Sequence, residues 1–106
     1  LAGFHNHTKQ KLLLKIYEKY PLADYFHFGD IDAGGFLIFN NLIEKTKIPF
    51  KPYKMSISEL ENNKTKLKGL TENDKKMLND SRFNIFHNTI RYMLENNVKL
   101  EQEILD

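Results

Sequence analysis

The segment that most restricts the possible folds is YFHFGDIDAGGFLIF, Tyr25 to Phe39, in which two aspartates stand between two apolar runs. The first run is short and aromatic and is bounded by Pro21 and Gly29, a pattern typical of a buried strand. The second run is apolar nearly all round and predicts a well-covered helix over 33–46. A short strand follows in PFKPYKM (49–55), where two prolines favour an edge position. This strand, helix, strand order predicts a βαβ unit and therefore a parallel sheet with a right-handed crossover.

The remaining elements are expected on both sides of this unit. Upstream, residues 1–4 suggest the end of a strand broken by Gly3, followed by a helix with Thr8 as its N-cap, which Pro21 ends. Downstream, Ser56 and Thr71 each begin a capping box. We expect a polar loop over 62–69, a helix over 82–97, and a tail that docks as a strand or a last helical turn.

These expectations define a domain organisation. The predicted strand and helix core covers about residues 1–55, and a helical portion covers about residues 56–106. The whole is a minimal sheet of two or three strands with four or five helices, in the α/β class.

Composition excludes several classes of protein. The chain has 106 residues with 16 Lys+Arg and 14 Asp+Glu, and the net charge of +2 is too small to indicate nucleic-acid binding by itself. The absence of cysteine excludes disulfides and thiolate metal sites and suits a cytoplasmic protein. No apolar run approaches the roughly 20 residues that span a bilayer, and the first residues do not resemble a signal peptide. Because the sequence begins with Leu1, we expect it to be a piece of a longer protein.

The two aspartates, Asp30 and Asp32, follow the aromatic strand directly. Ligands bind at the carboxyl ends of strands in open parallel sheets, and alternate side chains of an extended segment point the same way. Two neighbouring carboxylates repel each other unless a cation lies between them, and Mg²⁺ prefers such oxygen ligands. Gly34 and Gly35 would allow a substrate or backbone to approach closely. The pattern therefore predicts a magnesium or manganese site.

Three other interpretations of the aspartates are open. Asp32 can be the N-cap of the following helix, with Asp30 as a turn residue. An EF-hand loop also starts with D-x-D-x-G, but its twelfth position would be Asn41 instead of glutamate. Haloacid-dehalogenase-type phosphatases place D-x-D at a strand end as well, with Thr or Val where this chain has Gly34.

The segment FGDIDAGGFLIFNNL resembles the G-D-x-D-x-x-G-x-x-I-x-x-x-L motif of Toprim domains, in the variant of topoisomerase VI A subunits and of the Wadjet JetD C-terminal family. Upstream, AGFHNHTKQKLLLKI is similar to that family's Gly-aromatic strand end and R-x-x-L helix, although Lys9 or Lys11 stands where arginine is common. Downstream, LTENDKKML and VKLEQEIL resemble the JetD C-terminal pattern. The similarity covers nearly the whole chain.

This resemblance implies a Toprim-like (Rossmann-like) parallel sheet with flanking helices, of which the chain is a C-terminal part without the first strand. It also implies Mg²⁺-dependent (or Mn²⁺-dependent) cleavage of DNA phosphodiesters in plasmid defence. Asp30 and Asp32 would bind the metal together with a glutamate that lies before Leu1, so the chain alone would be inactive. DNA, SMC-like complex subunits and a second copy of the whole protein are the implied partners. The alternative is a Toprim-like module that binds DNA or a partner without cutting.

Several further residues are candidates for the site. Glu101 and Glu103 match the family's tail motif and have either a site role or a capping and salt-bridging role. Phosphate or DNA contacts are expected from residues near the upstream strand end and from the glycines after the aspartates: His5, Asn6, Lys9, Lys11, Gly34 and Gly35. His27 lies within the aromatic strand, and we expect it to be packed in the core.

Overall fold

The computed structural model describes residues 7–102. In these residues the elements follow in the order α1 (His7–Lys19), β1 (Phe26–His27), α2 (Ala33–Thr46), β2 (Lys51–Pro52), α3 (Ile57–Asn62), the 3₁₀ helix η1 (Lys64–Lys66), α4 (Glu72–Leu78), the 3₁₀ helix η2 (Ser81–Phe86) and α5 (His87–Asn96).

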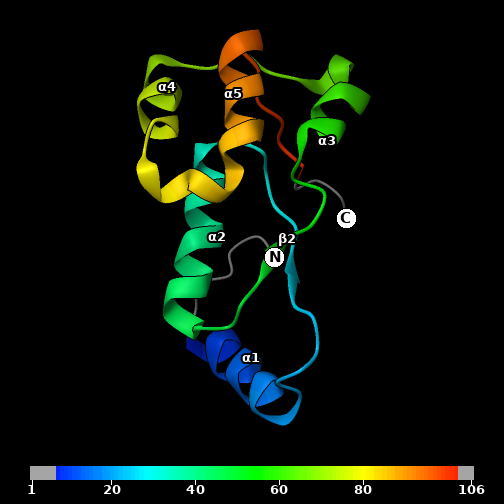
Figure 1. The fold of residues 1–106 in the computed structure, drawn as a ribbon, viewed down its shortest axis with the longest axis vertical. Helices are drawn as coiled ribbons and strands as arrows, with labels where there is room; N and C mark the ends of the chain where they lie inside the picture. The colour runs from blue at the N-terminus through cyan, green and yellow to red at the C-terminus, as the bar shows by residue number, and fades with distance from the viewer. Residues whose placement is uncertain (1–6, 103–106) are drawn as a thin grey trace.

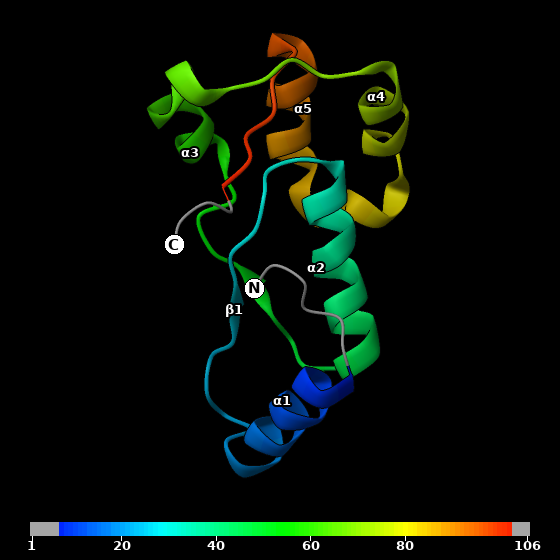
Figure 2. The same ribbon diagram turned by 180° about the vertical axis from the view of Figure 1, so that it is seen from behind.

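The two strands form a parallel pair in which Phe26 lies opposite Lys51 and His27 opposite Pro52. They are joined through α2, which confirms the predicted βαβ unit and the α/β class. Both strands run toward the end of the molecule that holds α3, α4 and α5, whereas α1 lies at the opposite end (Figures 1 and 2). The carboxyl ends of both strands therefore point toward the helical second half of the chain.

Helix α2 has the bounds that the sequence predicts. Asp32 is its N-cap and accepts a hydrogen bond from the Gly35 N–H, and the left-handed residue Lys47 ends it. The buried side of α2 includes Phe36 and Phe39, which are 0% and 1% exposed. Burial of this apolar side fixes α2 between the sheet and the helical second half.

The predicted single helix over 82–97 is wrong. The chain forms η2 up to Phe86 and continues as α5 only from His87. The backbone of Phe83 is non-helical (φ −93°, ψ 22°) and marks a kink within η2, and the side chains of Phe83 and Phe86 both reach Phe36 of α2. The Phe86 ring stacks on Phe36 with centroids 4.2 Å apart, and the Phe83 ring meets Phe36 edge-on at 5.9 Å. Aromatic packing against α2 thus overrides the α-helical pattern.

The first helix also differs from expectation at its start. Helix α1 begins at His7, so Thr8 lies inside it and is not the N-cap. The helix ends before Pro21, as predicted, and it packs at the end of α2 (Figures 1 and 2). The predicted strand over 1–4 lies outside the described residues.

The tail after α5 docks in extended form. Leu100 makes an antiparallel bridge with Ile31, and Lys99 makes another with Lys68. The second bridge begins inside the predicted loop over 62–69, which also contains η1. The tail thus joins the loop after β1 to the segment after η1. None of the helices in residues 7–102 has the length and apolar character needed to cross a bilayer.

Candidate functional site

The aspartate pair lies where β1 ends and α2 begins. Between the two aspartates, Ile31 is fully buried and pairs with Leu100: its N–H donates to the Leu100 carbonyl at 2.8 Å, and its carbonyl accepts from the Leu100 N–H at 3.1 Å. Since side chains alternate along an extended segment, Asp30 and Asp32 point to the side opposite the buried Ile31. Both aspartates are half-buried. The charge of Asp30 acts on Asp32, so the two carboxylates lie near each other.

Asp32 combines helix capping with an unusual electrostatic environment. Its Oδ1 accepts a 2.6 Å hydrogen bond from the Gly35 N–H. Burial raises the pKa of the Asp32 carboxyl, the Gly35 hydrogen bond opposes this, and the Asp30 carboxylate raises the pKa further. Burial and the neighbouring Asp30 carboxylate thus both disfavour the negative charge on Asp32.

Asp30 is held by the tail. Its Oδ1 accepts a 2.6 Å hydrogen bond from the backbone N–H of Gln102. The backbone of Asp30 lies close against the first turn of α2. A Cβ added at Gly35 would therefore overlap the Asp30 carbonyl oxygen and lie 2.9 Å from the carbonyl carbon. Gly35 is therefore needed for the close approach, whereas a Cβ at Gly34 would meet Asp32 Oδ1 at an ordinary 3.5 Å.

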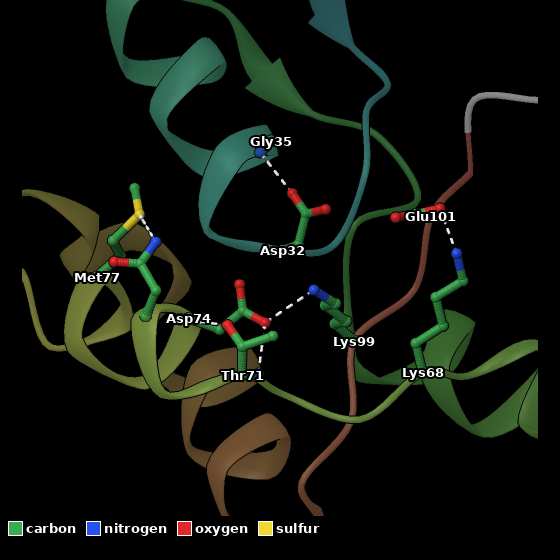
Figure 3. A network of polar contacts seen from close by, with 9 residues as sticks. Asp32, Gly35, Lys68, Thr71, Asp74, Met77, Lys99 and Glu101 are labelled. Carbon is green, nitrogen blue, oxygen red and sulfur yellow. Dashed lines mark hydrogen bonds and ion pairs between the residues drawn. The ribbon is translucent and has the colours of Figure 1, made fainter.

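Two lysines form ion pairs near Asp32 (Figure 3). The Lys99 ammonium contacts the Asp74 carboxylate at 2.7 Å in a mostly buried ion pair, with side chains 17% and 15% exposed. Burial alone would raise the pKa of Asp74, but Lys99 and the hydrogen bonds of Thr71 more than offset this and lower it. The charge of Lys99 also lowers the pKa of Asp32, against the effects of burial and Asp30.

Glu101 is oriented by an ion pair. Lys68 Nζ lies 2.8 Å from Glu101 Oε1, and this contact lowers the pKa of Glu101. The sequence left open whether Glu101 bridges a lysine or joins the site, and in this structure it forms the bridge. Its charge nevertheless raises the pKa of Asp32, so it contributes to the negative potential there.

The donor set fits a hard cation in part. Asp30 and Asp32 each use Oδ1 in a hydrogen bond, and the Oδ2 atoms have no hydrogen-bond partner within residues 7–102. Carboxylate oxygens suit Mg²⁺ or Mn²⁺. Across the described part of the chain, however, no three histidine, aspartate or glutamate side chains converge as a metal site. The described residues therefore bring together two carboxylates here, Asp30 and Asp32, and no third possible ligand.

The other predicted contact residues are distributed differently. Lys9 and Lys11 belong to α1, which packs at the end of α2 remote from Asp32, so the structure does not bring them to the aspartates (Figure 2). The phosphate or DNA contacts expected of these two lysines stay a prediction, at a place apart from the aspartates. His5, Asn6 and Glu103 lie outside the described residues.

The prediction that His27 is packed is confirmed. The residue is 7% exposed, its ring lies 6.0 Å from that of Phe39, and burial lowers its pKa to about 4. Sequence reasoning missed Gln102 and Lys99. The only signal for Gln102 was its place between the two glutamates of the LEQE motif, which drew attention to the acidic residues instead.

Comparison with known proteins agrees with the sequence resemblance. A family model described as Wadjet protein JetD, C-terminal, matches residues 2–106. The curated Wadjet protein JetD of Bacillus cereus (strain Q1) is 31% identical over 111 residues, which cover 98% of this chain and 27% of that protein. The chain thus spans just over a quarter of the length of this relative. No solved structure matches this chain significantly. The chain belongs to the C-terminal family of the Wadjet protein JetD.

Proposed function

We propose that this chain supplies two metal-binding carboxylates, Asp30 and Asp32, to a Toprim-type site that cleaves DNA phosphodiester bonds in the whole protein. The observation that carries the proposal is their position at the carboxyl end of β1. They lie on the side opposite the buried Ile31, and each keeps one oxygen without a partner in residues 7–102. This is the place where open parallel sheets bind ligands.

The aspartates would hold Mg²⁺ or Mn²⁺ through their Oδ2 atoms, with a further carboxylate from outside residues 7–102, as the family resemblance implies. When bound, the ion supplies positive charge that polarises a phosphate and activates a nucleophile. Asp32 must be ionised to bind it, and the positive charge of Lys99 favours the ionised form. Gly35 keeps the aspartate loop against the start of α2, so that the two carboxylates stay close together.

Membership of the family supports a role in plasmid defence, with DNA as substrate and SMC-like complex subunits as partners. The pairing of two whole proteins and a cytoplasmic location belong to the same proposal. The exposed lysines of η1 follow α3 at the strand-end side of the molecule, where they are available to phosphate groups (Figure 1).

The test is cleavage of supercoiled plasmid by the whole protein, with its partner subunits, across a Mg²⁺ titration. We expect nicked or linear product from the wild type, and a loss of at least about 100-fold in rate for Asp30→Asn and Asp32→Asn, because each removes a charged metal ligand. Asp24→Asn is the matched control, since Asp24 is exposed and contacts only Lys51, at 3.7 Å, among the described residues. Unchanged cleavage by both site variants would refute the proposal.

A second candidate is a Toprim-like module that binds DNA or a partner without cutting. It is favoured by the structural hydrogen bonds of the pair, since Asp32 caps α2 and Asp30 binds the tail. In that case the wild type would not cleave under any metal condition but would still bind its partner or DNA. Family membership supports either candidate over a haloacid-dehalogenase-type phosphatase.

A further inference from the structure

We propose that Gln102 is a positioning residue for the aspartate pair: it ties the loops after both strands together and fixes the Asp30 carboxylate. This inference rests on the proposed function, because what Gln102 positions is the metal-binding side of Asp30.

The Gln102 side chain joins the carboxyl ends of the two parallel strands. Its Nε2 donates to the carbonyl of Gly29, which follows β1, at 2.9 Å, and to the carbonyl of Lys54, which follows β2, also at 2.9 Å. An amide nitrogen has two N–H donors, so both are used. Among side chains of this length, a glutamate would lack these donors and would place a negative charge beside the two carbonyls.

The backbone of the same residue holds the aspartate. Its N–H donates to Asp30 Oδ1 at 2.6 Å, so one residue contacts both the peptide before Asp30 and the Asp30 carboxylate. With Oδ1 occupied in this way, Oδ2 is the oxygen left for a metal. Residues in such outer contacts orient metal ligands and affect metal affinity.

The tail stays docked by contacts that do not involve the Gln102 side chain. Leu100 is 2% exposed and pairs with Ile31 through two hydrogen bonds, and Lys99 pairs with Lys68 and forms the ion pair with Asp74. Removing the side-chain amide of Gln102 should therefore leave the fold intact and loosen only the loops around Asp30. This makes the inference testable by substitution.

The test measures Mn²⁺ binding to the whole protein carrying Gln102→Ala or Gln102→Glu. Electron paramagnetic resonance of the free ion reports the binding. We expect roughly 10- to 100-fold weaker binding for both, since both remove the amide donors. The matched control is Asn40→Ala: Asn40 also donates its side-chain amide to a distant carbonyl, that of Arg82, at 2.9 Å, but it contacts neither aspartate. Its Mn²⁺ affinity should equal that of the wild type.

Hydrogen exchange at the backbone amide of residue 102, which donates to Asp30 Oδ1, separates this inference from the proposed function. Gln102→Ala should accelerate exchange there, and Asn40→Ala should not. Wild-type affinity in both Gln102 variants would overturn the positioning role. If the wild type itself binds no Mn²⁺, the proposed function fails. Exchange at the residue-102 amide then decides whether the Gln102 side chain holds the tail against Asp30, and an unchanged rate in Gln102→Ala overturns that as well.

Discussion

Replacement of Gly35 by alanine tests whether the first turn of α2 must lie against the Asp30 backbone. The added Cβ would overlap the Asp30 carbonyl oxygen, and it would lie 2.9 Å from the carbonyl carbon and 3.2 Å from the Asp30 nitrogen. All three are backbone atoms, so no flexible side chain can move aside. Either α2 shifts and weakens the Asp32 cap, or the Asp30 loop shifts and weakens the pairing of Ile31 with Leu100.

Overpacking of this kind typically costs about 1 to 3 kcal/mol, and loss of an N-cap contact costs about 1 kcal/mol. We therefore expect Gly35→Ala to lower the free energy of unfolding by about 2 to 4 kcal/mol. Gly34 provides the control, because it is exposed and its added Cβ would meet only Asp32 Oδ1, at 3.5 Å. Gly34→Ala should leave stability unchanged or raise it by up to about 1 kcal/mol, the helix propensity difference.

Urea denaturation followed by far-UV circular dichroism measures both variants against the wild type. The expected result is that Gly35→Ala is less stable than Gly34→Ala by about 2 to 5 kcal/mol. Equal stabilities of Gly35→Ala and Gly34→Ala would refute the close packing of the aspartate loop on α2, and with it the geometry on which the metal site depends.

Two further predictions concern titratable groups. Burial lowers the pKa of His27 from 6.5 in the unfolded chain to about 4 in the folded chain. As pH falls from 6.5 toward 4, the unfolded chain binds a proton that the folded chain does not, so the free energy of unfolding decreases by at most about 3 kcal/mol. His27→Phe should flatten the pH dependence of urea stability between pH 6.5 and 5, and an unchanged slope would contradict the burial of a neutral imidazole. Lys99→Met should leave Asp74 without its partner and destabilise by about 1 to 2 kcal/mol at pH 7, with the difference from wild type shrinking below pH 4 as Asp74 is protonated. A loss independent of pH would show that packing of the Lys99 side chain, and not its charge, is what matters.

The sequence predicts well those elements whose signals are local. The side chains of Asp32 and Thr71 each accept a hydrogen bond from the backbone N–H three residues later, at the starts of α2 and α4. At the start of α3, the Glu59 carboxylate accepts from the backbone N–H of Ser56. Each signal lies within one helical turn, so it can be recognised from residue type and spacing alone. The first strand is predicted because Pro21 and Gly29 bound an aromatic run, and the prolines within 49–55 limit the second to a short edge strand.

What the sequence could not predict depends on contacts between distant residues. Gln102 lies 72 positions from Asp30, and no periodicity links them. The 3₁₀ form of η2 follows from aromatic packing on α2, since the isolated segment has an α-helical pattern. The position of Lys9 and Lys11 apart from the aspartates depends on the packing of α1 at the far end of α2, which residue types alone do not reveal.

The central claim is that Asp30 and Asp32 together bind a divalent cation in the whole protein. Mn²⁺ titration of the wild type, Asp30→Asn, Asp32→Asn and the control Asp24→Asn tests it most directly. The account predicts saturable binding by the wild type and by Asp24→Asn, and affinity at least about 10-fold weaker for each site variant, because a charged oxygen ligand is lost. Equal Mn²⁺ affinity in all four proteins would contradict it.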